Sequence, residues 1–248
     1  MVALKSYAVA DSQEAEIQSA ASFLNRRFEG VETETVLRTM FEALFRDKIA
    51  LVSSFGAESA VLLHLVSRIA PDAPILVIDT GKLFGETKRY WENLTEKLGL
   101  TGLRVVKPDE KDIAEMDPDG GLWARRSQAC CNIRKVRPLG KALDGFDAWI
   151  SGRKKYQSSG RNGLQLFEAD NEKIKINPLY DWTVDRVKLY ALQHDLPPHP
   201  LVEQGFLSIG CTPCTDRVAP GEDARAGRWR GEDKTECGIH LPSRGAQD

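Results

Sequence analysis

Short apolar runs alternate with helical patterns through the first half of the chain, and this alternation limits the folds that are open to it. Apolar runs at 48–53, 74–79 and 103–106 have the length and composition of buried strands. Between them, residues 58–69 and 85–98 carry apolar side chains at helical spacing. Strands joined through helices run parallel to one another. We therefore predict an α/β fold with a three-layer parallel sheet, whose ligands bind beyond the carboxyl ends of the strands.

The remainder of the chain extends this organisation on both sides. Apolar spacing predicts further helices over 12–28, 33–46, 129–143 and 184–194, and a strand at 146–151. The tail is poor in apolar side chains. We expect three parts, which are an N-terminal helical segment (1–47) packed on the core, an α/β domain (48–214) and a mobile C-terminal tail (215–248).

The bulk composition excludes several classes of function. A chain of 248 residues with 42% hydrophobic side chains is long enough to bury one sizeable core. A net charge of −2 gives no overall basic field for nucleic acid, and no apolar run reaches the roughly 20 residues that span a bilayer. The N-terminus lacks a signal-peptide core, so we expect a cytoplasmic protein that binds neither nucleic acid nor membrane. A homo-oligomer is compatible with this composition.

The turn after the first predicted strand has the composition of an anion site. In residues 53–59, the small side chains of Ser54, Gly56 and Ala57 let backbone N–H groups approach an anion at the start of a helix. The turn lacks the lysine of a Walker loop, and Glu58 beside it disfavours a heavily charged polyphosphate. An ordinary strand–helix turn is the alternative.

A second candidate turn follows the next strand. Asp79, Thr80 and Gly81 offer acceptors for a ribose or an adenine edge, although a capped turn would have the same composition. Two such turns at neighbouring strand ends favour a bound nucleotide more than either turn alone.

Basic side chains gather in three clusters that follow predicted strand ends or cysteines. A run of charges is usually a solvated face, but an arginine fork also matches the oxygens of sulfate and phosphate. An anionic substrate would need such clusters in a slightly acidic protein. The candidates for anion contacts are Lys135, Arg153, Lys154, Arg161, Arg225 and Arg228.

Four of the five cysteines form two pairs, Cys130-Cys131 and Cys211-x-x-Cys214. In a reducing compartment, clustered cysteines are more often ligands or catalysts than disulfides. Four thiolates from two segments suit an iron–sulfur cluster or a tetrahedral zinc ion. Adjacent cysteines chelate one zinc awkwardly, which favours the iron–sulfur cluster slightly; four cysteines without a metal remain the third option.

The fifth cysteine, Cys237, lies in the polar tail. An exposed thiol near cations has the surroundings of a reactive thiolate, and Arg225, Arg228 and a charged His240 could lower its pKa. An incidental surface thiol is the alternative.

Together these motifs resemble the assimilatory adenylyl-sulfate reductases, relatives of the 3'-phospho form within the adenine nucleotide alpha-hydrolase-like (PP-loop) superfamily. The resemblance spans about 48–240. Its carriers are residues 53–59, 79–81, 130–135, 176–179, 210–214, 225–229 and 236–240. Against the family pattern, Lys154 and Lys155 stand where arginines are usual, and Arg161 matches the arginine that closes that loop.

The resemblance implies a [4Fe–4S] cluster on Cys130, Cys131, Cys211 and Cys214. It implies that Cys237 attacks the sulfur of adenosine 5'-phosphosulfate, releases AMP and leaves an S-sulfonated cysteine. Thioredoxin would then reduce this intermediate and release sulfite. Relatives that use the 3'-phosphorylated substrate generally lack the four cluster cysteines, so the unphosphorylated substrate is favoured.

Three other functions are weighed against this one. The near alternative is a reductase of 3'-phosphoadenosine 5'-phosphosulfate. A non-catalytic metal-binding or redox-sensing module would keep the cysteine pairs but would not need Cys237 for sulfite formation. An ATP-using tRNA-thiolating enzyme of the same superfamily is weaker, because no segment resembles an RNA-binding appendage.

Overall fold

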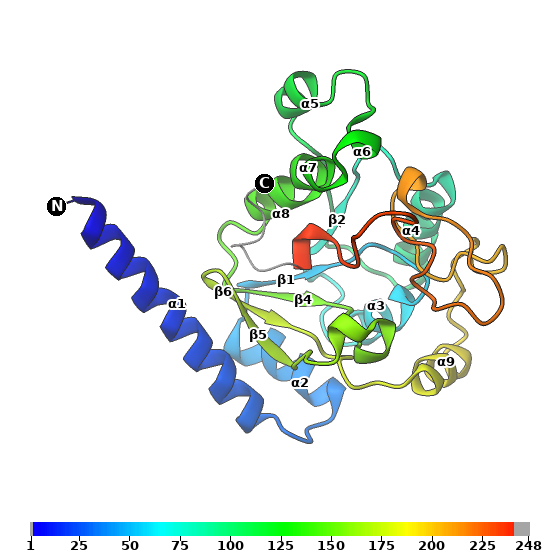
Figure 1. Cartoon of the computed structure of the whole chain (residues 1–248). Coiled ribbons are helices and arrows are strands. Elements are labelled where there is room, and N and C mark those ends of the chain that lie inside the picture. Colours follow the sequence, from blue (N-terminus) through cyan, green and yellow to red (C-terminus); the bar gives the residue numbers. More distant parts are fainter. Residues whose placement is uncertain (1, 241–248) are drawn as a thin grey trace.

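The computed structural model describes the backbone of residues 2–240 and the side chains of residues 13–240. Within that part of the chain, six strands form one sheet in the order β3-β2-β1-β4-β6-β5 (Figure 1). All neighbouring strands are parallel except β5 and β6, which form an antiparallel hairpin at one edge. The strands are β1 (Ile49–Val52), β2 (Ile75–Ile78), β3 (Leu103–Val106), β4 (Ala148–Ser151), β5 (Phe167–Asp170) and β6 (Lys173–Ile176).

Helices flank this sheet and lead into it. The α-helices are α1 (Val2–Arg27), α2 (Thr33–Thr39), α3 (Ser59–Ser67), α4 (Gly85–Lys97), α5 (Glu110–Met116), α6 (Leu122–Arg125), α7 (Ser127–Cys131), α8 (Arg137–Ala142) and α9 (Val184–Gln193). Two π-helical turns, Met40–Leu44 and Asn132–Val136, extend α2 and join α7 to α8. Single 3-10 turns lie at Lys155–Gln157, Ser159–Arg161, Thr212–Cys214 and Gly238–His240.

Alternation along the strands sends side chains to two separate cores. On one face, Ile49, Leu51 and Ile150 pack in a large cluster with α3, α4 and α9. On the other face, Ala50 and Trp149 pack in a smaller cluster with α8. The predicted three-layer α/β fold is confirmed, and the carboxyl ends of β1, β2 and β4 meet at one edge.

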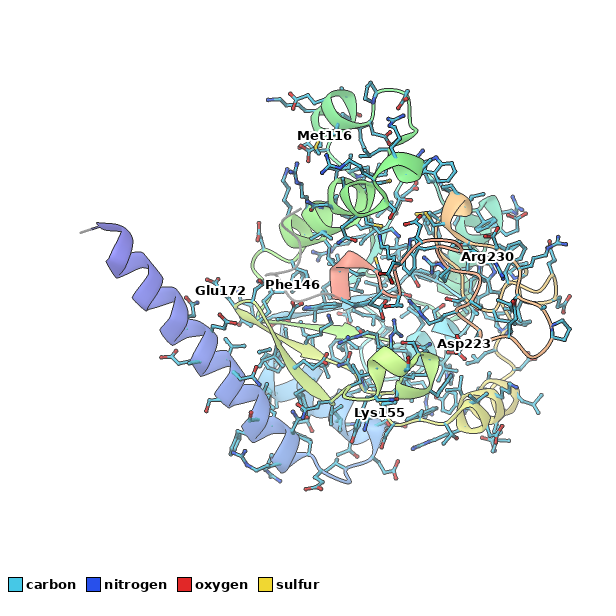
Figure 2. The ribbon with its side chains drawn as sticks, in the orientation of Figure 1. Met116, Phe146, Lys155, Glu172, Asp223 and Arg230 are labelled. Atoms are coloured by element: carbon cyan, nitrogen blue, oxygen red, sulfur yellow. The ribbon has the colours of Figure 1, made fainter. Side chains whose placement is uncertain are left out.

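The sequence patterns located β1 to β4, α3, α4 and α9 to within a few residues, but they missed the β5–β6 hairpin and α5. The hairpin carries Glu168, Glu172, Lys173 and Lys175 among its apolar residues, so it lacks the apolar run of a buried strand. In Figure 2, Glu172 at the hairpin turn lies at the same end of the sheet as Phe146, which precedes β4. Because one strand of the hairpin is antiparallel, the sheet is mostly rather than wholly parallel.

The two ends of the chain lie against this core in different ways. The C-terminal half of α1 covers the edge strand β5, where Asn25 Nδ2 donates to the Phe167 carbonyl at 2.7 Å. Residues 215–240 wrap over the carboxyl edge of the sheet, and their last turn lies beside the Asn132–Val136 segment (Figure 1). The mobility of the tail stays a prediction, and residues 241–248 lie outside the described part. No described helix combines the length and the apolar character needed to cross a membrane.

Candidate active site

The conformation of the turn after β1 is fixed by its own backbone and by a buried aromatic ring. Phe55 adopts a left-handed conformation (φ 47°) and is fully buried against Trp91, with ring centroids 6.4 Å apart. At Gly56, a Cβ atom would lie 3.3 Å from Ser54 Oγ and 3.5 Å from the Ile209 carbonyl. The predicted small-residue turn is therefore narrow, and its backbone is accessible only because the side chains are small.

Glu58 at the start of α3 binds the basic loop after β4. Its carboxylate accepts from Tyr156 Oη at 2.7 Å, Gln157 Nε2 at 2.8 Å and Lys154 Nζ at 3.1 Å. Burial raises the pKa of Glu58, but the Lys154 charge and these hydrogen bonds outweigh burial and lower it. Lys154 is only 2% exposed and also donates to the Gly152 carbonyl, so its ammonium is committed to the protein.

The turn after β2 is tied to the cysteine segments. The Thr80 hydroxyl lies 3.2 Å from Cys211 Sγ, and Thr212 N donates to the Lys82 carbonyl at 2.8 Å. Asp79 pairs with Lys88 at 2.7 Å and accepts from the Gly81 N–H at 3.0 Å. One of the two predicted nucleotide turns thus also lies against the cysteine pairs.

A buried ion pair, which the sequence patterns did not predict, supports this turn from the helix side. Arg134 donates to the Thr80 carbonyl at 2.8 Å and to Asp117 Oδ2 at 2.6 Å. Asp117 is 1% exposed, and its other oxygen accepts from the Leu122 N–H at 2.7 Å. Burial raises the pKa of Asp117, but Arg134 and the Leu122 N–H outweigh it and lower that pKa. No local pattern marks an aspartate in a polar loop as buried.

All five cysteines are free thiols, and the structure brings them to one region. Cys130, Cys211 and Cys214 lie close enough to influence one another electrostatically, and burial raises the pKa of Cys130 and of Cys214. Cys131 instead forms a hydrogen bond with Cys237. In this arrangement, no three His, Cys, Asp or Glu side chains of the described residues are placed to hold a metal ion.

The contact of Cys237 with Cys131 shifts the pKa values of the two thiols in opposite directions. The hydrogen bond from Cys131 lowers the pKa of Cys237; burial opposes this effect and the Lys135 charge adds to it. The same bond raises the pKa of Cys131. Burial alone would lower the pKa of Lys135, but Cys237, Cys211 and Cys131 raise it, so Lys135 stays an ammonium beside Cys237. A second cation, Lys234, donates to Cys131 Sγ at 3.3 Å.

Beside Cys237, Glu236 lies between two arginines. Arg161 contacts Glu236 Oε2 at 2.6 and 2.7 Å, and Arg225 contacts Oε1 at 3.2 Å. Burial raises the pKa of Glu236, but the two arginine charges outweigh it and lower that pKa. Arg161 and Arg225 therefore gather at one anion-binding position, while Arg153 pairs with Glu168 behind it.

The remaining predicted contacts lie around this position. Arg228 donates to the Cys214 carbonyl at 3.2 Å and lies 4.4 Å over the Trp229 ring. Burial, followed by the charges of Lys175 and Arg153, lowers the pKa of His240 well below its ordinary value. Its ring is therefore neutral, and the prediction of a charged His240 is wrong. Among the described side chains, three buried nitrogen atoms have no hydrogen-bond partner: Arg225 Nε, Trp229 Nε1 and His240 Nδ1.

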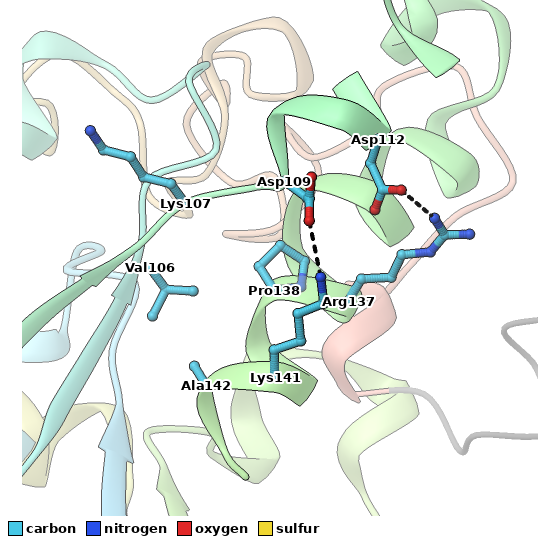
Figure 3. A pocket seen from close by; sticks show the side chains of 8 residues that line it. All are labelled: Val106, Lys107, Asp109, Asp112, Arg137, Pro138, Lys141 and Ala142. Carbon is cyan, nitrogen blue, oxygen red and sulfur yellow. Dashed lines mark hydrogen bonds and ion pairs between the residues drawn. The ribbon is translucent and has the colours of Figure 1, made fainter. Parts of the chain in front are cut away.

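A separate cavity of about 300 Å³ lies beyond β3 (Figure 3). Two ion pairs bridge α5 and α8 across it, Asp109–Lys141 at 3.1 Å and Asp112–Arg137 at 3.0 Å. No cysteine lines it and these four charges are paired, so it takes no part in the site.

The protein is an α/β protein with five free cysteines at the carboxyl edge of its mostly parallel sheet. The family model of the phosphoadenosine phosphosulfate reductase domain matches residues 48–217. An adenosine 5'-phosphosulfate reductase of Mesorhizobium japonicum is 46% identical over 91% of this chain and 89% of that protein. One of Chelativorans sp. is 50% identical over 80% of this chain and 82% of that protein. The chain belongs to the phosphoadenosine phosphosulfate reductase family.

A solved structure agrees with this assignment. The phosphate complex of phosphoadenylyl-sulfate reductase from Candida auris matches with a TM-score of 0.68 at 26% identity. The match covers 81% of this chain and 97% of the other. The predicted family is thus confirmed by sequence and by fold.

Proposed function

We propose that this protein reduces adenosine 5'-phosphosulfate to sulfite and AMP in sulfate assimilation. The observation that carries the proposal is the position of Cys237, which is partly buried beside the Lys135 ammonium. The preceding residue, Glu236, contacts Arg161 and Arg225. A nucleophile surrounded by cations suits an electrophile that carries negative charge.

The first step transfers a sulfonate group to the protein. The Cys237 thiolate attacks the sulfur of the substrate, and an S–S bond forms as the bond from sulfur to the bridging phosphate oxygen breaks. The electron pair of that bond leaves with AMP, whose phosphate gains negative charge. The charges of Lys135 and Arg228 already act on Cys237 and stabilise this shift, and Arg225 joins them once it exchanges Glu236 for the substrate.

Before substrate binds, Glu236 holds Arg161 and Arg225 in place. Its carboxylate occupies the position between Arg161 and Arg225, and an anionic group of the substrate would compete for the same donors. The unpartnered Nε of Arg225 offers a further donor at this position.

A [4Fe–4S] cluster on Cys130, Cys131, Cys211 and Cys214 is part of the proposal. The donor set fits: all four thiols are free, three of them interact electrostatically, and the Thr80 hydroxyl can donate to Cys211. The buried Trp229 indole N–H has no partner, as a donor to sulfur would before its acceptor is bound. Cys131 would have to turn from Cys237. When bound, the cluster would supply fixed charge and join the two cysteine segments.

The second step needs a dithiol reductant, and we assign it to thioredoxin. One thiolate of the reductant attacks Cys237 Sγ, sulfite leaves with the electron pair of the S–S bond, and the second thiol resolves the mixed disulfide. The reductant is oxidised to its disulfide, and Cys237 returns as a thiolate. Cys237 must move out of its partly buried position for this attack.

The test is sulfite release from each of the two candidate substrates, with thioredoxin supplied. Turnover of adenosine 5'-phosphosulfate and none by a Cys237→Ser variant supports the proposal. Turnover confined to the 3'-phosphorylated substrate would refute the substrate assignment. A Cys237→Ser variant that still releases sulfite would refute the nucleophile.

A further inference from the structure

A lysine on β6, the strand next to the edge of the sheet, is buried under the last turn of the tail. Lys175 lies on β6 opposite Trp149 of β4 and Glu168 of β5, and it is only 4% exposed. Its neighbours Ile174 and Ile176 point into the large core, so Lys175 points to the opposite face, where the tail lies. A methionine would fill this place without the cost of burying a charge. The buried ammonium is therefore expected to make a contact that a methionine could not.

The contacts of Lys175 lead to the tail. Its Nζ lies 4.4 Å over the Trp149 ring, 4.0 Å from Asp170 Oδ2 and 3.4 Å from the Ile239 carbonyl. Trp149 Nε1 donates to the same Asp170 oxygen at 2.9 Å, which fixes the ring. Burial and the neighbouring Arg153 lower the pKa of Lys175 to about 8, which leaves it charged at neutral pH.

The tail rests on this platform through the residues that follow Cys237. His240 stacks on Trp149 with an interplanar angle of 10° and centroids 6.2 Å apart. Ile239 packs into the smaller core, and the His240 N–H donates to the Cys237 carbonyl at 2.9 Å. The backbone of Cys237 is thereby one turn away from a fixed point of the sheet.

We propose that Lys175, supported by Trp149 and Asp170, is a positioning residue that holds the Gly238–His240 turn on the sheet and so places Cys237 for attack. This inference rests on the proposed function of Cys237. Before substrate binds, Glu236 is held by Arg161 on the preceding side of Cys237. Lys175 and Trp149 together anchor the Gly238–His240 turn to the sheet itself.

The test compares Lys175→Met with Lys173→Met in the full-length, anaerobically purified protein. Lys173 lies on the same strand and the same face, but it donates to the Phe146 carbonyl, which belongs to the core. Hydrogen–deuterium exchange of residues 235–240, AMP affinity and the single-turnover rate of Cys237 S-sulfonation are measured. Because a hydrogen bond from a charged donor is lost, exchange of the tail should accelerate about tenfold or more in Lys175→Met.

The S-sulfonation rate should fall by a similar factor in Lys175→Met, while AMP affinity is retained and Lys173→Met behaves as wild type. Unchanged tail exchange, or faster exchange with an unchanged S-sulfonation rate, would overturn the proposal. Equal acceleration in residues 167–176 would also overturn it, because Lys175 would then only stabilise the hairpin.

Different measurements test the anchor and the proposed function. Tail exchange needs no substrate, so it tests the anchor even if Cys237 is not the nucleophile. Absence of S-sulfonation in the wild-type protein would refute the proposed function instead. If Lys175→Met loses AMP affinity, Lys175→Gln, which keeps an uncharged donor in the strand, is measured in its place, with the same outcomes deciding.

Discussion

Replacing Asp117 by asparagine should destabilise the protein strongly, although the change conserves shape. Asp117 and Arg134 form a contact of 2.6 Å in which both side chains are almost fully buried. Removing one partner of a buried ion pair costs about 3–5 kcal/mol, because the other charge stays buried without compensation. Asparagine keeps an oxygen for the Leu122 N–H, and Arg134 keeps the Thr80 carbonyl. We therefore expect the lower end, about 3 kcal/mol.

For a chain of this length, a loss of about 3 kcal/mol corresponds to a decrease in Tm of about 6 to 12 °C. Thermal unfolding of the anaerobic protein measures it. The matched control is Asp119→Asn, two residues away, where Arg125 contacts the carboxylate at 2.7 Å but both side chains are more than half exposed. Solvent screens that pair, so its loss should leave Tm nearly unchanged. Equal shifts in the two variants would refute the reasoning that burial, rather than distance, determines the contribution.

Three further predictions concern the site. Glu58→Gln should lower the stability of the protein at neutral pH, because the folded protein binds the ionised carboxylate, which lowers the pKa of Glu58. The difference from the wild type should vanish as pH falls through that lowered pKa. Tm measured against pH checks this. Lys154→Met should lower Tm, because the Lys154 ammonium binds the Glu58 carboxylate inside the protein. A variant with lower substrate affinity but the Tm of the wild type would contradict this. Cys211→Ser should abolish the brown colour of the purified protein and Cys237→Ser should retain it, which visible absorption spectra decide.

Regular alternation made most of the sheet predictable from sequence. The runs that became β1, β2 and β4 are apolar on both faces, because both faces are covered by helices or by the tail. The β5–β6 hairpin lacked this signal, because its charged residues meet partners from distant segments. Lys175 is the clearest case, since its burial depends on Trp149 and on the tail.

The site was predictable where chemistry requires particular residues at particular spacing. Paired cysteines and small-residue turns identified the region, and the structure brings both predicted turns and all five cysteines to it. Pairing was not predictable, because a charge in a sequence does not reveal its partner. Lys154 binds Glu58, and Arg134 binds an aspartate 17 positions away.

The intact mass of the protein after incubation with adenosine 5'-phosphosulfate, in the absence of reductant, shows directly whether Cys237 is the nucleophile. We expect an added mass of one sulfonate group, which peptide mapping locates on Cys237 and which thioredoxin removes as sulfite. An adduct on any other cysteine, or sulfite formation by the wild-type protein without any sulfonate on Cys237, would contradict this expectation.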